Sequence, residues 1–255
     1  MSPAERDALE TTLLNILAAT LNLEGLLVPA PPLVNWKVRN RISFENGIPK
    51  GIYVQGSNTG ANGTKQRVTA APLPWDSSRT GSRFEIVHGE HWNTKSKYPR
   101  AEYMLEKDWL EFDREYAIET TFALSGTIPT HGEMVAVLQL HDRSNGSPPI
   151  ALAIKDGRFL LYTRDNPSRP KVASPVVLDR IEPGRVYALR LEFKASLSTS
   201  GFARVLLDGV ERSKLTGKIG HLSGAFAYIK TGLYDYDLIC DSLIMHSDGL
   251  RVYER

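Results

Sequence analysis

The chain has 255 residues, of which 42% are hydrophobic, enough for one large all-β domain or two small domains with a substantial core. Its 31 Lys and Arg residues nearly balance its 29 Asp and Glu residues, so no overall field draws it to nucleic acid or to a membrane. Attraction to a polyanion would have to come from a local groove. Cys240 is the only cysteine, which excludes an internal disulfide and a multi-cysteine zinc site.

The N-terminus carries Glu5, Asp7 and Glu10 against Arg6, a charge unlike that of a signal peptide. No run of residues is long and apolar enough to span a bilayer as a helix. We therefore expect no export by a signal peptide. A protein that acts on an extracellular polymer would then be released by lysis, as a phage product is, and its localisation otherwise stays open.

Residues 1–27 are predicted to form an N-terminal amphipathic helix and connector, and residues 28–255 the main domain. Ser2 can cap the helix, Pro3 suits its first position, and Glu5 completes a capping box. An apolar stripe at helical spacing follows, made by Leu9, Leu13, Ile16, Leu17 and Leu21. The helix either packs on the main domain or serves in oligomerisation or docking, and the sequence leaves both open.

From Leu33 onward the hydrophobic period changes to two, with short alternating runs separated by turn residues. The candidate strands are 34–44, 52–55, 66–71, 82–88, 100–106, 115–124, 134–142, 150–155, 158–163, 186–194, 202–208, 225–234 and 237–246. Asp156-Gly157 and Asp208-Gly209 are hairpin signals, because both residue types tolerate the positive φ of tight turns. The pattern predicts an all-β sandwich or barrel.

The strand predicted at 225–234 carries polar and aromatic groups on one face. Because side chains alternate along a strand, Tyr228, Lys230 and Tyr234 point one way, while Ile229 and Leu233 point to the core. Lys230 is either a solvated strand lysine or a cation suited to an anionic chain.

Two further strands have the same property. Gln139 and His141 share a face in one, and Arg100 and Glu102 share a face in the other. Gln139 and His141 by themselves would suit a solvated polar pair. If the three strands lie side by side, however, their groups converge on one surface suited to an acidic sugar.

Such a set of groups can break the chain of a uronic acid polymer by β-elimination. The C5 proton of a uronate is only weakly acidic, so the enzyme must stabilise the charge that grows on the neighbouring carboxylate, and Arg100 and Gln139 are suitable donors. His141 can take the C5 proton, and Tyr234 can protonate the departing O4 or serve in both roles. No metal or organic cofactor is needed for this reaction.

The motifs resemble the signature strands of the β-jelly-roll polysaccharide lyases, the group of alginate lyases, glucuronan lyases and heparin lyase I. The resemblance covers roughly residues 80–247 and rests on the order and spacing of three motifs. They are R-A-E-Y at 100–103, Q-L-H at 139–141 and Y-I-K-T-G-L-Y at 228–234. Residues 83–90 also resemble the run that precedes the first motif in glucuronan-lyase and heparin-lyase-like members.

The resemblance implies a concanavalin-like jelly-roll sandwich whose concave sheet holds the polymer. It implies that Arg100 and Gln139 neutralise the substrate carboxylate, while His141 and Tyr234 exchange protons. Lys230, Tyr228 and Glu102 are the expected substrate-binding groups, with Glu102 pairing with a cation to hold Arg100.

The substrate is expected to be an anionic polysaccharide, alginate or glucuronan above others. Tyr103 and Asp235 depart from the alginate lyase pattern, so the polymer stays open. Some relatives carry a structural calcium, but no metal site is predicted here, because His88 and His91 lack helical spacing and a third ligand. Neither a nucleic-acid nor a membrane partner is expected, and the oligomeric state stays open.

Two other functions fit the same sequence. The first is a non-catalytic carbohydrate-binding module, because the same sandwich serves lectins. The second is a phage virion-associated depolymerase of the same lyase type, whose N-terminal helix docks to a larger assembly. A binding module would not need His141 and Tyr234 together.

Overall fold

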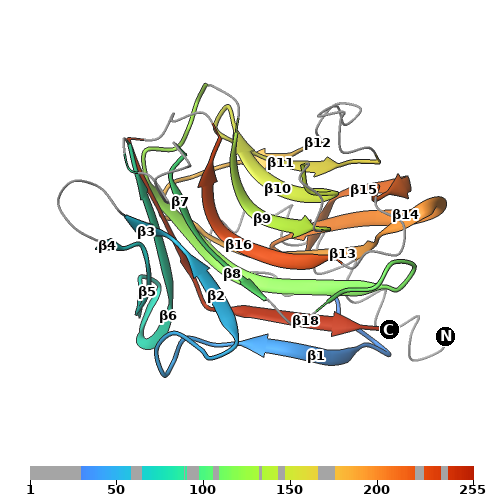
Figure 1. The fold of residues 1–255 in the computed structure, drawn as a ribbon, viewed down its shortest axis with the longest axis horizontal. Coiled ribbons are helices and arrows are strands. Elements are labelled where there is room, and N and C mark those ends of the chain that lie inside the picture. Colours follow the sequence, from blue (N-terminus) through green and yellow to red (C-terminus); the bar gives the residue numbers. More distant parts are fainter. Residues whose placement is uncertain are drawn as a thin grey trace, which may run out of the picture.

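A computed structural model describes residues 30–58, 65–88, 90, 98–105, 109–131, 134–142, 147–165, 176–221, 227–236 and 241–255. The regular secondary structure of these residues consists of β-strands, and none of these residues lies in a helix (Figure 1). The described part of the chain accordingly offers no helix that could cross a membrane. The helix predicted within 1–27 lies outside the described residues.

The strands form two large antiparallel sheets, as the alternation predicted. The nine-stranded sheet has the order β15-β14-β13-β8-β17-β6-β5, with β18 also on β8 and β1 on β18. Its members are β1 (Lys37–Ile42), β5 (Val68–Leu73), β6 (Asp76–Val87), β8 (Tyr116–Gly126), β13 (Val186–Lys194), β14 (Ser196–Leu207), β15 (Val210–Ile219), β17 (Ser242–Ser247) and β18 (Leu250–Glu254).

The seven-stranded sheet has the order β12-β11-β10-β9-β16-β7-β2. Its members are β2 (Ile52–Gln55), β7 (Arg100–Leu105), β9 (Val135–His141), β10 (Ile150–Lys155), β11 (Arg158–Thr163), β12 (Val176–Arg180) and β16 (Tyr228–Asp235). A short ladder of β3 (Ser57–Asn58) and β4 (Lys65–Gln66) stands apart. Two sheets packed face to face make the sandwich that the sequence predicted.

Aromatic side chains from both sheets interlock in the core between them. Phe84 of β6 stacks on Tyr103 of β7 with ring centroids 5.8 Å apart. Phe122 of β8 meets Phe159 of β11 edge to face at 5.6 Å. All four side chains are at most 2% exposed, so this layer fixes how the seven-stranded sheet sits on its partner.

The two predicted hairpins are confirmed. Asp156 and Gly157 join β10 to β11 with φ of 52° and 69°, and Asp208 and Gly209 join β14 to β15 with φ of 52° and 76°. The predicted set of strands, in contrast, lacked β3, β12, β15 and β18. β15 at a sheet edge alternates half-buried and exposed residues, so its sequence carries little apolar signal. The strand predicted at 237–246 begins at Ser242 in the described part of the chain.

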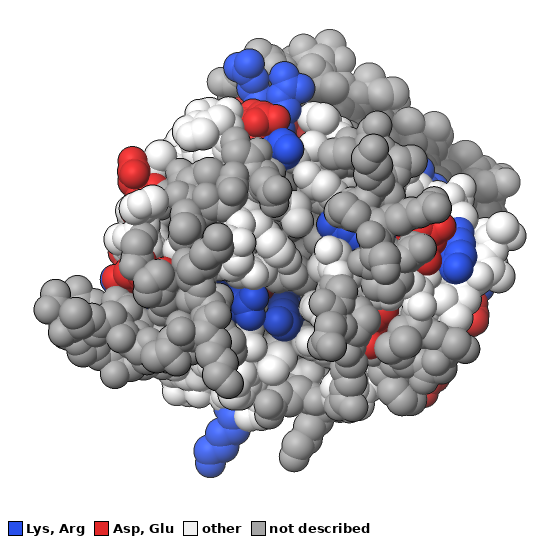
Figure 2. All heavy atoms as spheres, turned by 45° about the horizontal axis from the view of Figure 1, so that its top comes forward, with Lys and Arg blue, Asp and Glu red and all other residues white. Residues whose placement is uncertain are grey.

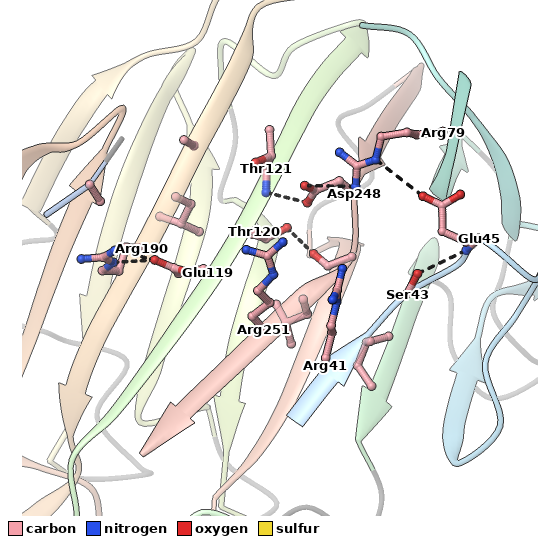
Figure 3. Close-up of a pocket in the computed structure, with 16 residues that line it drawn as sticks. Arg41, Ser43, Glu45, Arg79, Glu119, Thr120, Thr121, Arg190, Asp248 and Arg251 are labelled. Atoms are coloured by element: carbon pink, nitrogen blue, oxygen red, sulfur yellow. Dashed lines mark hydrogen bonds and ion pairs between the residues drawn. The ribbon is translucent and has the colours of Figure 1, made fainter. Parts of the chain in front are cut away.

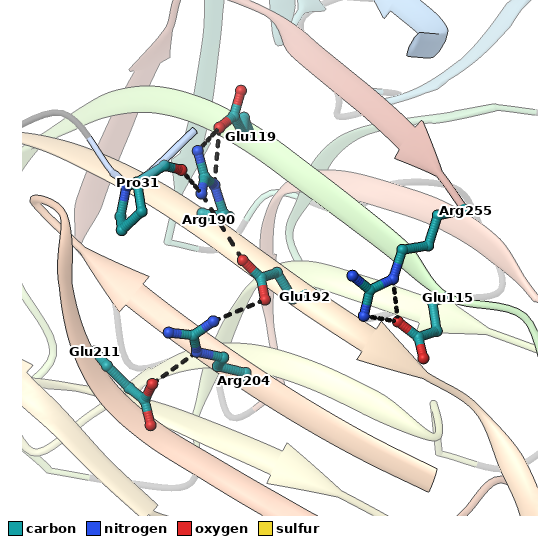
Figure 4. A network of polar contacts seen from close by, with 8 residues as sticks. All are labelled: Pro31, Glu115, Glu119, Arg190, Glu192, Arg204, Glu211 and Arg255. Atoms are coloured by element: carbon teal, nitrogen blue, oxygen red, sulfur yellow. Dashed lines mark hydrogen bonds and ion pairs between the residues drawn. The ribbon is translucent and has the colours of Figure 1, made fainter. Parts of the chain in front are cut away.

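Ion pairs run across four strands of the nine-stranded sheet (Figure 4). Arg190 of β13 contacts Glu119 of β8 at 2.5 Å, and Arg204 of β14 contacts Glu192 of β13 at 3.1 Å. Arg204 also contacts Glu211 of β15 at 2.7 Å. Each of these five side chains therefore has a partner of opposite charge on a neighbouring strand.

Gly232 allows β16 to lie close against β7. Its φ is +135°, which L side chains rarely adopt. A Cβ atom there would lie 2.2 Å from the Ala101 carbonyl oxygen and 2.6 Å from the Glu102 Cα. Both contacts are with backbone, so only glycine fits in the middle of this strand.

Replacing Gly232 by Ala should therefore lower the free energy of unfolding by more than backbone strain alone, which costs roughly 1 to 3 kcal/mol. Gly157→Ala is the matched control, because Gly157 also has a positive φ but no atom within 4 Å of an added Cβ. Chemical denaturation of both variants gives the comparison. An equal loss of stability in the two would contradict the close approach of β16 to β7.

Candidate active site

The three motif strands lie side by side, with β16 between β7 and β9. Residues directly opposite each other in antiparallel strands share a face of the sheet. The opposing pairs are Tyr228 with His141, Lys230 with Gln139, Gly232 with Glu102, and Tyr234 with Arg100. All seven predicted site residues are thus brought together on one face, as the sequence analysis expected.

This face points away from the core of the sandwich. On β16 the core side is formed by Ile229 and Leu233, neither of which is exposed. Figure 2 looks from the upper side of Figure 1, where the seven-stranded sheet lies, and shows Lys and Arg side chains at the bottom of a hollow. The site therefore has the form of a groove with positive charge at its floor.

Glu102 lies at the centre of a polar network on this face. Its Oε2 is 3.1 Å from the Nε of Arg100, and its Oε1 accepts a hydrogen bond of 2.5 Å from the Nε2 of Gln139. The Oε1 of Gln55, at the end of β2, accepts from Arg100 Nη1 at 3.1 Å and from Lys230 Nζ at 3.4 Å. Two cations are thus held by one carboxylate and one amide.

The charges of this network do not cancel. Glu102 is 2% exposed; burial raises the pKa of its carboxyl, while Arg100, Lys230 and the Gln139 amide oppose the rise. Burial lowers the pKa of Lys230, and Glu102 opposes that shift. Among the described residues that these contacts join, Arg100 and Lys230 are two cations and Glu102 is one carboxylate. This arrangement suits an anionic group in the groove.

The amide of Gln139 is held in one orientation. An ionised carboxylate only accepts hydrogen bonds, so the NH₂ group of Gln139 must face Glu102. On the other side, the hydroxyl of Tyr236 donates to Gln139 Oε1 at 3.2 Å. Two partners thus fix the Gln139 donor in place.

Tyr234 lies against Arg100 at one end of the network. The Arg100 guanidinium carbon is 3.8 Å from the centre of the Tyr234 ring, and the ring of Tyr236 packs at 4.1 Å. Burial raises the pKa of the Tyr234 phenol, and the charge and hydrogen bond of Arg100 oppose this. The phenol is therefore protonated at neutral pH and can donate a proton.

His141 lies at the other end, two residues beyond Gln139 on the same face. Its ring stacks on Tyr228 at 5.4 Å, and Trp109 meets Tyr228 edge to face at 5.7 Å. Burial, and then the charge of Lys230, lower the pKa of His141 to about 4. The imidazole is therefore neutral near neutral pH and can accept a proton.

Sequence reasoning missed four polar residues around the site. Gln55 and Tyr236 belong to the network, and Asp142 and His221 form a buried pair next to His141 with 2.8 Å between Oδ2 and Nδ1. Each finds its partner across strands that are distant in the sequence. The only signal available was position, since Asp142 adjoins the Q-L-H motif and Tyr236 follows Tyr234 by two residues.

A cavity of about 200 Å³ lies elsewhere, at β1, β8, β13 and the turn before β18 (Figure 3). It is lined by side chains of both charges. Arg79 lies 3.6 Å from Glu45 and 4.0 Å from Asp248 there, and Arg190 pairs with Glu119. Its lining also includes Arg41 and Arg251, so four arginines and three carboxylates face this cavity.

Within the described ranges, no group of three or more His, Cys, Asp and Glu side chains is placed to hold a metal ion.

Several solved structures have a fold similar to that of this chain. The chain resembles an endo-β-1,4-glucuronan lyase from the fungus Trichoderma reesei, with a TM-score of 0.66 and 14% identity over 85% of this chain and 95% of that chain. It resembles alginate lyase A1-II′, a member of polysaccharide lyase family 7, with a TM-score of 0.59 and 17% identity over 80% and 93%. A product complex of a variant of that lyase matches with a TM-score of 0.57 and 17% identity over 75% and 85%.

No protein-family model and no curated protein sequence matches the chain. At these identities the likeness shows the fold alone. It confirms the resemblance to jelly-roll polysaccharide lyases at the level of the fold.

The low pKa of His141 can be measured by following its ring protons by NMR, with His141→Gln to assign the signal. We expect a midpoint near pH 4, because burial and Lys230 disfavour the imidazolium. Since the unfolded chain binds this proton below about pH 6.5, the native state should lose stability as the pH falls from 6.5 towards 4. His141→Gln should lack that loss, and a midpoint near 6.5 would contradict the burial of a neutral imidazole.

Proposed function

We propose that the protein is a polysaccharide lyase that cleaves a uronate polymer, alginate or glucuronan, by β-elimination. The observation that carries this proposal is the pair of cations Arg100 and Lys230 beside the oriented amide of Gln139, flanked by a neutral His141 and a protonated Tyr234. The proposed partner is an anionic polysaccharide, which this charge attracts. The fold supports the proposal, since structures with the same fold include glucuronan and alginate lyases.

The first requirement of the reaction is to stabilise the carboxylate of the reacting sugar. When the C5 proton leaves, negative charge grows on that carboxylate, and fixed donors lower the barrier because they need no reorientation. Gln139, held by Glu102 and Tyr236, is such a donor. Arg100 supplies a full positive charge beside it.

The second requirement is a base and an acid. In the proposed step His141 takes the proton from C5, the C4–O4 bond breaks, a double bond forms between C4 and C5, and Tyr234 gives its proton to O4. The neutral state of His141 and the protonated state of Tyr234 both suit these roles at neutral pH. The substrate carboxylate lies between them, against Arg100 and Gln139.

A screen of the purified protein tests the function. Alginate, glucuronan, hyaluronan and heparin are each incubated with it, and the ultraviolet absorbance of the unsaturated uronate product is followed. We expect an increase with alginate or glucuronan. Binding to an acidic polymer without any increase would favour the carbohydrate-binding module instead.

Tyr234→Phe removes the acid and keeps the ring against Arg100, so the protein should fold and kcat should fall by roughly 10² to 10⁴. Tyr253→Phe is the matched control, because it removes a phenol that bonds Glu119 on the nine-stranded sheet. Initial rates of product release give the comparison. Activity near wild type in a folded Tyr234→Phe protein would refute Tyr234 as the acid.

Gln139→Leu should lower kcat strongly and change KM little, because the donor matters most when charge develops on the carboxylate. One such donor contributes roughly 2.7 to 4 kcal/mol to the stabilisation of the transition state. Steady-state kinetics on one polymer separate the two constants. A rise in KM with kcat unchanged would make Gln139 a contact of the ground state only.

A further inference from the structure

Arg164, directly after β11, is a buried cation near one edge of the seven-stranded sheet. It is 4% exposed, and its backbone is fixed on both sides by hydrogen bonds with Pro149 and Gly220. Its Nη1 donates to the carbonyl oxygen of Pro148 at 2.8 Å, while its Nε has no hydrogen-bond partner. No carboxylate of the described residues pairs with it.

A buried guanidinium without a carboxylate is costly. The penalty for burying an unpaired charge is several kcal/mol, and arginine does not escape it by losing its proton. Burial lowers the pKa of Arg164, and the nearby phenols of Tyr236 and Tyr162 only oppose that shift. Neutral phenols do not balance a full charge, and an anionic ligand would.

The position of Arg164 relates it to the site described above. Its guanidinium carbon is 5.5 Å from the ring of Tyr162. Tyr162 is opposite Ala151, and Ala151 is opposite Gln139, so only a methyl side chain stands between them. Neighbouring strands lie about 5 Å apart, and β11 is two strands away from β9. Tyr162 therefore lies about 10 Å from Gln139 across the sheet.

The same register continues to the other edge of the sheet. One row of residues crosses six strands in order, made by Tyr53, Met104, Lys230, Gln139, Ala151 and Tyr162. The row begins at a tyrosine that is 41% exposed and ends beside Arg164. A polymer lying across the strands would follow this row, with its reacting sugar at Gln139.

We propose that Arg164 forms a second carboxylate subsite, which binds a further uronate residue of the same polymer, along the row from the one held by Arg100 and Gln139. This proposal rests on the proposed function for the identity of the polymer. The planar fork of a guanidinium suits a carboxylate, which can take two parallel hydrogen bonds from it. The subsite selects polymers in which the sugar that reaches Arg164 is also charged.

Isothermal titration calorimetry tests the subsite without turnover when each variant also carries Tyr234→Phe. The probes are oligoglucuronates and oligomannuronates from disaccharide to hexasaccharide, with uncharged cello-oligosaccharides for comparison. Arg164→Met should weaken binding of the charged oligomers that reach the subsite by roughly 10- to 100-fold. Arg158→Met, an exposed arginine on the same strand, should change nothing.

Arg164→Lys keeps the charge and loses the fork, so its affinity should lie between those of the parent and Arg164→Met. If thermal melting shows that Arg164→Met does not fold, Arg164→Lys decides the question. Unchanged dissociation constants for every charged oligomer in the folded variants would overturn the subsite.

The same data separate this proposal from the lyase proposal. If the protein with Tyr234 intact cleaves no uronate polymer but binding of oligouronates depends on Arg164, the lyase proposal fails and the subsite stands. If the protein with Tyr234 intact cleaves a polymer and the Arg164 variants bind oligouronates as the parent does, the subsite proposal is wrong and the lyase proposal stands. Failure to bind any oligouronate contradicts both.

Discussion

The buried carboxylate of Glu102 is the contact on which the site depends. It holds Arg100 by an ion pair and Gln139 by a hydrogen bond, and its charge offsets part of the positive charge that Arg100 and Lys230 bring. Without it, two cations would lie close together on one face of a sheet, and the Gln139 amide could turn. One buried acid thus both stabilises the strands and aims the donors into the groove.

The order of the strands allows Glu102 to reach Gln139. β16 lies between β7 and β9, so an acid on β7 and an amide on β9 reach each other across it. The residue opposite Glu102 on β16 is Gly232, which has no side chain to block that path. The core aromatics fix the sheet from its other side.

Much of this arrangement could be predicted from the sequence. The period of two places Arg100, Gln139 and Lys230 on faces rather than in loops, and the glycine after Thr231 marks a close approach of strands. The alternation of side chains along a strand does not show which strands are neighbours in the sheet. The sequence analysis gave their adjacency only as a condition, and the structure places β16 between β7 and β9.

The missed residues share a physical reason. Gln55 and Tyr236 act through partners on other strands, so no local spacing indicates them. The pKa of His141 likewise depends on burial by surrounding segments, which its Q-L-H motif does not encode. The missed strand β15 alternates half-buried with exposed residues, so its sequence carries little apolar signal.

The central claim is that the groove removes the C5 proton of a uronate and expels O4, and the mass of the product tests it directly. An oligouronate carrying deuterium at C5 is incubated with the protein, and the fragments are weighed by mass spectrometry. Elimination predicts that the fragment with the new non-reducing end has lost the C5 deuterium and weighs one water less than a hydrolysis product. A fragment that keeps its deuterium and has gained water would contradict the claim.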